Sequence, residues 1–381
     1  MVKVLKGMRV VEMGTFITGP AAAMHLADLG ADVIKVESRN RPCLSRIDVQ
    51  VSASRRGDFD DKPWFAHLNT SKRSLALDLK RNEASEVIDP LLDWADAVVE
   101  NFSPGTMARL GLDYGSISAR NPGVVMASGS VYGQTGPLSR EWGVDGTGGA
   151  LSGRTFLTGW PDSDPVIPGA VPYGDVIVPY VMAACVIAGL TDRRRSRRGC
   201  HIDASMYEIC VQQMMPAIRA AQSGSVPQRM GNADLSVFHQ DLYPARGEDR
   251  WVAITLFDES DRQKLDELAG GRPIAEWSRE HDDHELVAVL QSAGIAAGCV
   301  QDIEDLIDRD LALMRRGALV DLPHPKLGVF GHIRTPIEFS AETIAPYRAP
   351  GIGEHSRQIA VDAAHIDASR VAELEAEGIF T

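Results

Sequence analysis

The first 130 residues alternate between short apolar stretches and amphipathic stretches, and this alternation constrains the fold more than any other feature. The apolar stretches, which we predict to be buried strands, are residues 9–13, 32–37, 96–100 and 123–128. Helical patterns lie between them, for example at 21–29 and 82–95. Strands that alternate with helices predict a mostly parallel sheet whose ligands bind at the carboxyl ends of the strands. We therefore expect an α/β fold with a Rossmann-like large domain.

The strand at 32–37 ends on an acidic residue, Glu37, as it does in many dinucleotide-binding units. The glycine fingerprint of such sites is missing, however. Gly14 and Gly19 lie five residues apart, and the sequence contains neither GxGxxG nor GK[ST] at this point. The sequence therefore argues against a dinucleotide cofactor.

The stretch Pro168–Leu190 joins a loop rich in glycine and proline to a run without charge from Val176 onward. We expect this run to form a helix that is buried on most sides, with Asp175 at its start. One interpretation makes Asp175 the helix N-cap. Pro179 favours a helix that begins at Val178, because proline belongs in the first turn, and Asp175 then lies in the loop. Spacing alone leaves a structural and a catalytic role open.

Charge and cysteine content argue against several classes of function. The 381 residues include 39 basic and 52 acidic ones, and the net charge of −13 argues against nucleic acid or an anionic membrane as a partner. The five scattered cysteines show no CxxC spacing, which predicts reduced thiols in a cytoplasm and no metal site. No uncharged apolar run is long enough to span a membrane, and we see no signal-peptide pattern. We expect a cytoplasmic protein.

The chain is long for a single core, so two domains are expected. Composition shifts near Gly224, and a strand at 251–257 followed by helices from about 258 to 293 indicates a smaller α+β domain. We predict a large domain at 1–223, a small domain at 224–330, and a segment at 331–381 that returns to the large domain. The arginine run at 193–198 is interpreted as a solvated face, with a phosphate site as the alternative.

Several phrases resemble motifs of the class III CoA-transferases and of the related α-methylacyl-CoA racemases. They occur in the order of that family over essentially the whole chain. The phrases are Gly7–Met13 with Thr18-Gly-Pro20, Leu26–Glu37, Asn69–Leu79, Val99–Gly105 with Arg109-Leu-Gly, Gly133–Pro137, Tyr243-Pro, Ala293–Gly298 and Gly353-Glu-His355. Gly174-Asp175 falls where the family has its catalytic aspartate.

The resemblance implies an enzyme that moves coenzyme A from an acyl-CoA to a carboxylic acid, with Asp175 as the nucleophile. A carboxylate can attack the thioester to give a mixed anhydride and a CoA thiolate. The thiolate returns to form an aspartyl-CoA thioester, the first acid leaves, and a second acid repeats the cycle. The resemblance also implies an interlocked homodimer.

The resemblance further implies the residues of the binding site. CoA contacts are expected from Phe16, Ile17, Lys72, Asn101, Phe102 and Arg109. Because Ser38 follows Glu37 where other residues are common, Arg39 and Arg73 are further candidates for holding a CoA phosphate.

The sequence departs from the family's pattern around Phe238, His239 and Gln240, where formyl-CoA transferase has a glycine-rich loop. We expect these three residues to contact the acid substrate. The bulk of Phe238 and His239 favours an acid larger than formate or oxalate, either aromatic or dicarboxylic.

Two alternatives remain open from the sequence. A racemase needs two titratable groups on opposite sides of an α-carbon. Asp175 could be one, but Val144 stands where the racemases have a catalytic histidine. A non-catalytic subunit of a two-chain transferase would keep the fold, although the presence of Asp175 argues against this.

Overall fold

The computed structural model describes residues 4–47, 58–167, 171–340 and 344–381. Contacts within the chain divide it into two units. Unit 1 comprises Met1–Arg154, Pro168–Pro216 and Gly317–Thr381, and unit 2 comprises Thr155–Ile167 and Ala217–Arg316. The predicted domain boundaries at residues 223 and 330 refer to parts that fold independently. The division by contacts does not test independent folding, so these boundaries stay a prediction.

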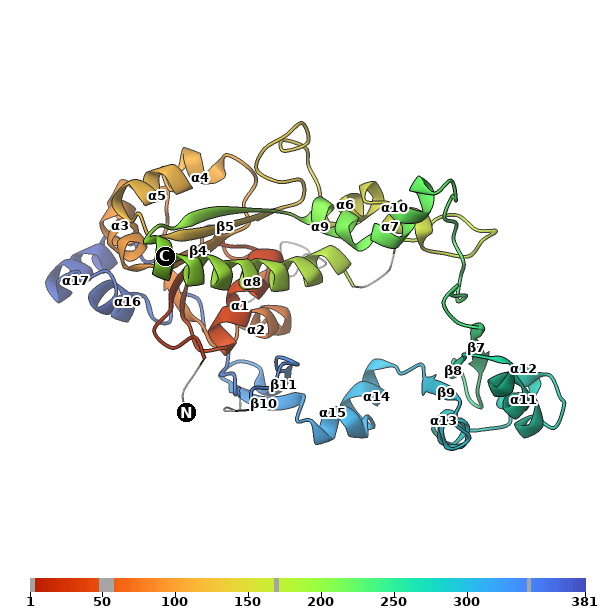
Figure 1. Cartoon of the computed structure of the whole chain (residues 1–381). Helices are drawn as coiled ribbons and strands as arrows, with labels where there is room; N and C mark the ends of the chain where they lie inside the picture. The colour runs from red at the N-terminus through yellow and green to blue at the C-terminus, as the bar shows by residue number, and fades with distance from the viewer. Residues whose placement is uncertain (1–3, 48–57, 168–170, 341–343) are drawn as a thin grey trace. The chain divides into compact units, whose positions relative to one another are not determined.

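Unit 1 is built on a six-stranded parallel sheet with the order β3-β2-β1-β4-β5-β6 (Figure 1). The strands are β1 (Arg9–Glu12), β2 (Asp32–Glu37), β3 (Arg73–Ala76), β4 (Ala97–Glu100), β5 (Val125–Ser130) and β6 (Cys200–Ser205). The order reverses between β1 and β4, so the loops that follow these two strands diverge and leave a crevice at their carboxyl ends. The predicted α/β fold with a parallel sheet is confirmed.

Helices cover both faces of this sheet, as expected for a parallel sheet. One face carries α1 (Thr18–Asp28), α8 (Tyr173–Ser196) and α9 (Met206–Gln213). The other carries α3 (Ser85–Trp94), α5 (Tyr114–Arg120), α16 (Ser356–Asp362) and α17 (Ala368–Ala376). The remaining elements of unit 1 are η1 (Leu44–Arg46), α2 (Pro63–Leu68), η3 (Asn82–Ala84), α4 (Thr106–Arg109), α6 (Asp145–Leu151) and the hairpin β10 (Leu319–His324) with β11 (Gly328–Ile333).

Helix α8 differs from the prediction in where it begins. It begins at Tyr173 with Pro172 at the N-cap, so Asp175 is neither the cap nor a loop residue but lies in the first turn. Pro179 is inside the helix, where it cannot donate the backbone hydrogen bond of a regular helical turn. Residues 168–170, the start of the predicted loop, lie outside the described residues.

The C-terminal end of α8 carries part of the arginine run. Arg193 donates to Asp96 at 3.0 Å and to the carbonyl of Gly123. Arg194, Arg195, Arg197 and Arg198 are exposed, as the solvated interpretation predicts.

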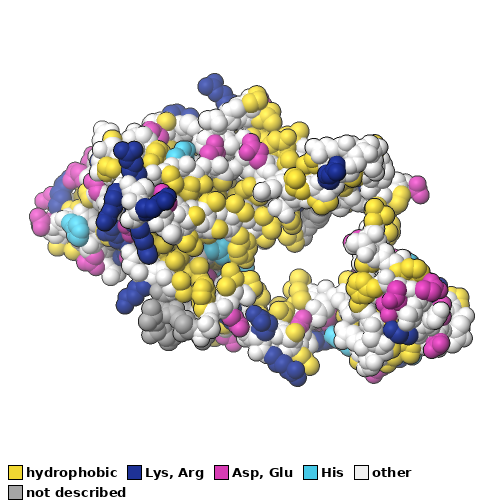
Figure 2. Space-filling view, viewed as in Figure 1, with side chains coloured by type: hydrophobic (Ala, Val, Ile, Leu, Met, Phe, Trp, Pro, Cys, Tyr) yellow, Lys and Arg dark blue, Asp and Glu magenta, His cyan; other side chains and the backbone are white. Residues whose placement is uncertain are grey.

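By length and composition α8 could cross a membrane, but 39% of its apolar window is buried inside the protein, where it packs on α1 and β5. The expectation that it is buried on most sides is wrong for the single chain. Val176, Tyr180, Ala184 and Ala188, each four residues from the next, are exposed and form an apolar stripe. Yellow side chains gather along this part of the surface in the space-filling view (Figure 2). We call these four residues the α8 stripe.

A group of fully buried charges joins β1, β2 and the turn before β3. Glu12, Lys35 and Lys72 each have a side chain with no exposure. The carboxylate of Glu12 accepts from Lys35 at 2.7 Å and from Lys72 at 3.0 Å. It also accepts from the backbone N–H of Gly14 at 3.0 Å. Burial by itself raises the pKa of Glu12, but the two ammonium groups outweigh it and lower that pKa.

Within unit 1, the C-terminal segment is held to the edge of the sheet through a second buried ion pair. Arg46 contacts Glu37 at 2.9 Å, Asp60 at 2.6 Å and the carbonyl of Pro350 at 3.1 Å. Beyond it, the side chain of Ser356 accepts from the backbone of β3 at Ala76. Because these contacts involve residues far apart in sequence, they tie the end of the chain to the sheet edge.

Unit 2 contains a three-stranded antiparallel sheet with the order β7-β8-β9 and its own apolar core. Its elements are β7 (His239–Pro244), β8 (Trp251–Leu256), α11 (Glu259–Leu268), α12 (Ile274–Ser278), α13 (Asp283–Ser292), β9 (Ala296–Cys299), α14 (Ile303–Asp308) and α15 (Leu311–Arg315). Helices α7 (Arg154–Leu157) and α10 (Met215–Gln222) contain boundaries between the units.

The buried charges around Glu12 generate a prediction on stability. Lys72→Met leaves Glu12 with one of its two cations, and removing one member of a buried ion pair costs about 3–5 kcal/mol. We expect the variant to unfold at a clearly lower urea concentration than the parent, measured by circular dichroism. Lys80→Met, at an exposed position, is the control and should change the free energy of unfolding by less than about 0.5 kcal/mol. Equal midpoints for the two variants would contradict the structural role of Lys72.

Candidate active site

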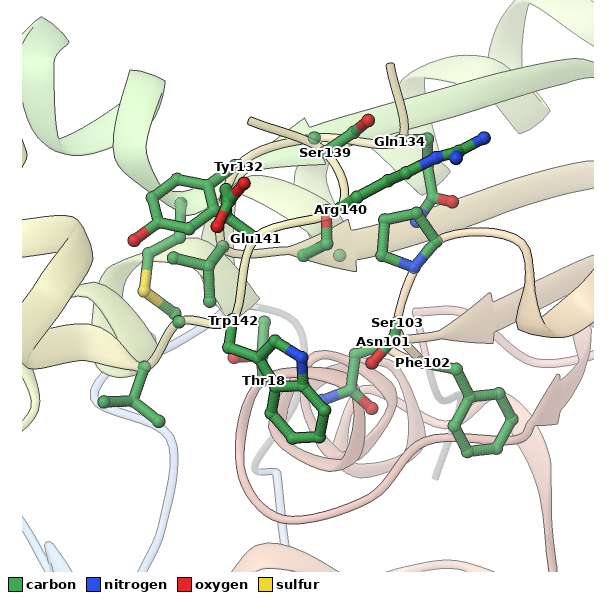
Figure 3. Close-up of a pocket in the computed structure, with 18 of the residues that line it drawn as sticks. Thr18, Asn101, Phe102, Ser103, Tyr132, Gln134, Ser139, Arg140, Glu141 and Trp142 are labelled. Atoms are coloured by element: carbon green, nitrogen blue, oxygen red, sulfur yellow. The ribbon is translucent and has the colours of Figure 1, made fainter. Parts of the chain in front are cut away.

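A cavity of about 810 Å³ lies at the crevice between β1 and β4. Its walls come from the loops after β1, β4 and β5 and from the starts of α1, α6 and α8 (Figure 3). The close-up shows Thr18 from α1, Asn101–Ser103 from the loop after β4, and Tyr132, Gln134 and Ser139–Trp142 from the loop after β5. This is where a doubly wound sheet is expected to bind a ligand.

Asp175 reaches this cavity from the first turn of α8, and 9% of the residue is exposed. Its Oδ1 accepts a hydrogen bond from Thr18 Oγ1 at 2.5 Å. Burial raises the pKa of Asp175, the hydrogen bond from Thr18 acts in the opposite direction, and the nearby Asp145 adds to the rise. The carboxylate is therefore desolvated and has a hydroxyl, not a cation, as its partner.

Asp145 holds the start of α8 in place. Its Oδ1 accepts from the N–H of Gly174 at 2.6 Å, and its Oδ2 pairs with Arg154 at 3.0 Å. A Cβ at Gly174 would lie 2.7 Å from Asp145 Oδ1, so only glycine allows this approach. Both carboxylate oxygens of Asp145 thus have partners, and one of these partners is Gly174, the residue before Asp175.

Asn101 locks the loops after β1 and β4 together. Its side chain accepts from the N–H of Thr15 at 2.7 Å and donates to the carbonyl of Thr15 at 2.8 Å. A Cβ at Gly19 would come within 2.7 Å of Asn101 Oδ1. The predicted contact residue Asn101 therefore lines the cavity and also fixes its shape.

Glu100, the last residue of β4, also fixes the loop that follows this strand. It is buried, and its carboxylate accepts from the N–H of Phe102 at 2.7 Å. Burial raises the pKa of Glu100 to about 7, and the charge of Asp203 adds to the rise. The start of the loop after β4 is thus fixed by both Glu100 and Asn101.

Three other predicted CoA contacts line the cavity, namely Phe16, Phe102 and Arg109. Phe16 has a φ of +65°, an unusual conformation for a residue with a side chain, and its ring meets Trp64 edge to face. Arg109 is exposed and donates to Thr106 at 2.8 Å.

Four predicted contacts do not line the cavity. Ile17 packs in a small apolar cluster. Lys72 is fully buried on Glu12, Arg73 binds Asp32 through two hydrogen bonds, and Arg39 donates to the carbonyl of Ile352. Their side chains are committed to the protein itself.

Phe238, His239 and Gln240 belong to unit 2. Phe238 is exposed, His239 pairs with Tyr243 at 2.9 Å, and Gln240 bonds Thr255 and Asn232. They are not among the residues that line the cavity. Their contact with the acid stays a prediction.

Sequence reasoning missed other residues of the cavity wall. Arg140 is exposed, and Trp142 is 97% exposed. Ser130 Oγ and Gln134 Nε2 are buried without a hydrogen-bond partner in the described part of the chain. Thr18 and Gln134 lie inside the phrases that carry the family resemblance, which was the available signal, whereas nothing local distinguishes Arg140.

One set of potential metal ligands lies in unit 2. The ligand atoms of Asp283, His284 and Cys299 lie within 4.8 Å of one another. Arg250 already pairs with Asp283, and burial raises the pKa of the Cys299 thiol to about 11. A cation would have to displace the guanidinium and ionise the thiol, so the group does not favour metal binding.

Comparison with known proteins gives a consistent result. The family model described as CoA-transferase family III matches residues 5–356. The chain is 27% identical to succinyl-CoA–D-citramalate CoA-transferase of Chloroflexus aurantiacus, over 99% of this chain and 98% of the relative. It is 29% identical to succinate–glutarate CoA-transferase of Agrobacterium fabrum, over 93% and 94%. The crystal structure of a CAIB/BAIF family protein from Brucella suis matches with a TM-score of 0.85 and 27% identity, covering 95% of this chain and all of that one.

Proposed function

The chain belongs to CoA-transferase family III, and we propose that it transfers CoA from an acyl-CoA to a carboxylic acid through covalent intermediates on Asp175. One observation carries the proposal. A largely buried carboxylate that has no cationic partner among the described residues faces a cavity large enough for a substrate.

The position of Asp175 suits nucleophilic catalysis. A carboxylate with a raised pKa and a thin hydration shell is a better nucleophile than one in water. It attacks the thioester carbon, and the CoA thiolate leaves. The thiolate then attacks the Asp175 carboxyl carbon, the first acid departs, and an aspartyl-CoA thioester remains. A second acid attacks this thioester, and the released thiolate takes the new acyl group, which frees Asp175.

Polar groups of the cavity support CoA as the ligand. Arg109 and Arg140 are exposed and form no ion pair with any residue that the structure describes, so both can bind phosphate groups. The unpartnered Ser130 hydroxyl and Gln134 amide suit the amide groups of the pantetheine arm. Trp142 offers a flat apolar surface for the adenine ring.

The same geometry argues against a racemase. Val144 has no proton to exchange, and the neighbouring Asp145 uses both oxygens for Gly174 and Arg154. Neither position therefore offers Asp175 a free base, and the other carboxyl group of the described cavity wall, Glu141, lies on the exposed part of the loop after β5. Transfer needs only one nucleophile and a second acid.

We infer that the acceptor is a dicarboxylic acid. Two relatives over nearly the full chain are named for transfer to D-citramalate and between succinate and glutarate. The bulky sequence at Phe238, His239 and Gln240 agrees with an acid larger than formate. The acid screen below tests this class directly.

We also propose that the enzyme is a homodimer in a cytoplasm. The α8 stripe is an uncharged apolar surface on a core helix, and such surfaces mark protein–protein contacts. The five cysteines are free thiols, which agrees with a reducing compartment.

Asp175→Asn should fold like the parent but lose at least about three orders of magnitude in transferase activity, because the nucleophile is gone. Activity is measured as new acyl-CoA masses after incubation of succinyl-CoA with a panel of monocarboxylic, aromatic and dicarboxylic acids. Asp192→Asn, on the exposed end of the same helix, is the matched control and should keep full activity. Retained activity in Asp175→Asn would overturn the proposed nucleophile.

Deuterium uptake at the α-carbon of a 2-methylacyl-CoA in D₂O, faster than acid exchange, would favour the racemase.

Arg109→Ala and Arg140→Ala should each weaken CoA binding without changing the fold. Loss of one charge-assisted hydrogen bond costs about 1–3 kcal/mol, which corresponds to a rise in Kd of roughly 5- to 150-fold. Titration calorimetry with CoA measures the Kd of each variant. Higher salt screens the charges and should reduce the difference in Kd between variant and parent. Arg120→Ala is the control, since Arg120 pairs with Asp89 and Asp93 away from the cavity. Unchanged affinity in both cavity variants would place CoA elsewhere.

Ala184→Glu should shift the protein from dimer to monomer in sedimentation experiments. The change puts a carboxylate in the middle of the α8 stripe, where burial without a partner is costly. Ala372→Glu adds the same charge at an exposed alanine of α17, next to the exposed Glu373, and should leave the dimer intact. A parent protein that sediments as a monomer would refute the proposed homodimer.

A further inference from the structure

Thr18 is a buried hydroxyl whose bond with Asp175 joins two elements far apart in the sequence. It is the first residue of α1, is 5% exposed and lines the cavity. Its Oγ1 donates to Asp175 Oδ1 at 2.5 Å. We propose that Thr18 is a catalytic residue that donates a hydrogen bond to the oxygen of Asp175 on which negative charge develops. This inference rests on the proposed role of Asp175 as nucleophile.

Two contacts fix the position of Thr18. The N-terminal turn of α1 is tied down by Lys72, which donates to the carbonyl of Pro20 at 2.7 Å. The methyl group of Thr18 lies against Gly129, where a Cβ would come within 3.3 Å of it. The hydroxyl therefore points at Asp175 without needing to reorganise during the reaction, which is what makes a donor effective in catalysis.

The hydrogen bond from Thr18 to Asp175 contributes differently to the different steps of the transfer reaction. When Asp175 attacks the acyl thioester through Oδ2, Oδ1 becomes the carbonyl oxygen of the anhydride. When the CoA thiolate attacks the Asp175 carboxyl carbon, the C–S bond forms and the electron pair of the C=O bond moves onto Oδ1. Collapse of this intermediate breaks the bond to Oδ2, which leaves with the first acid. The second acid attacks the same carbon and places charge on Oδ1 again.

Thr18 consequently favours the two steps at the aspartyl carbon. A hydrogen bond to Oδ1 is stronger when that oxygen carries a full charge than when it is a carbonyl oxygen, so it lowers the barrier to attack on the anhydride and on the thioester. The same hydrogen bond does not lower the barrier to the first step, the attack of Asp175 on the acyl thioester, because there it stabilises the carboxylate before the reaction. Loss of the hydroxyl should therefore slow formation of the aspartyl-CoA thioester.

Three variants separate this role from simple packing. Thr18→Val keeps the shape and the methyl contact with Gly129 but removes the donor, whereas Thr18→Ser keeps the donor. Thr70→Val makes the same chemical change at another buried threonine that donates to an aspartate, Asp28 at 3.0 Å, outside the cavity. Thermal unfolding of all three establishes that they fold.

The experiment mixes each enzyme with succinyl-CoA, quenches with acid at increasing times, and measures the CoA adduct on the Asp175 peptide by mass spectrometry. We expect Thr18→Val to form it about 100-fold more slowly, the size of effect seen when one oxyanion donor is lost. KM for the acyl-CoA should stay within about threefold. Thr18→Ser and Thr70→Val should behave like the parent.

The pH dependence supplies a second readout that packing alone would not move. The hydrogen bond from Thr18 lowers the pKa of Asp175, so its removal raises that pKa. The rise in rate with increasing pH, which reports ionisation of Asp175, should therefore shift to higher pH in Thr18→Val and not in Thr18→Ser. Equal adduct rates and an unshifted profile in Thr18→Val would overturn the role of Thr18. A parent enzyme that forms no adduct on Asp175 would instead overturn the proposed nucleophile.

Discussion

The carboxylate of Glu12, buried between two lysines, is the interaction on which the site depends most. Ionised groups without contact to water are stable only when they are paired, so Glu12 requires both Lys35 and Lys72 in fixed positions. Lys35 also donates to the carbonyl of Gly14, and Lys72 to that of Pro20. Through these contacts one buried charge fixes both ends of the loop between β1 and α1. That loop carries Phe16 and Thr18.

The other half of the site is fixed in the same way by Asp145 and Arg154, which hold the start of α8. The two halves meet where Thr18 contacts Asp175. Glu12 and Asp145 have cationic partners, whereas Asp175 has only a hydroxyl. Burial is the largest influence on both carboxylates and acts to raise both pKa values, but the net pKa is raised only for Asp175, because no cation compensates there. Asp175 thus differs from the paired carboxylates around it, which supports its proposed role as the nucleophile.

The sequence predicted the main elements of unit 1 and several residues that line the cavity, and the differences arise where contacts between distant parts of the chain decide the structure. Strands and helices of unit 1 follow from apolar periodicity, which is a local property. Lys72 was misplaced because a lysine in a family phrase looks the same whether it binds a ligand or a buried carboxylate. The start of α8 was misplaced because Pro179 is tolerated inside a helix that other contacts hold, including Asp145 at Gly174. Thr18 was missed as a site residue because its partner lies 157 positions away.

In the proposed mechanism Asp175 is subject to two opposing requirements, and its surroundings suit both. Desolvation makes the carboxylate more nucleophilic, but it also favours the protonated form, which cannot attack. A lysine or arginine beside Asp175 would keep it ionised but would also weaken it as a nucleophile, as an ion pair stabilises the ground state. A neutral hydroxyl shifts the balance less than a full charge would, and it offers a donor to the oxyanion of the later steps. A threonine in place of a cation at this position therefore agrees with the proposed mechanism, in which one carboxylate first attacks and is then attacked.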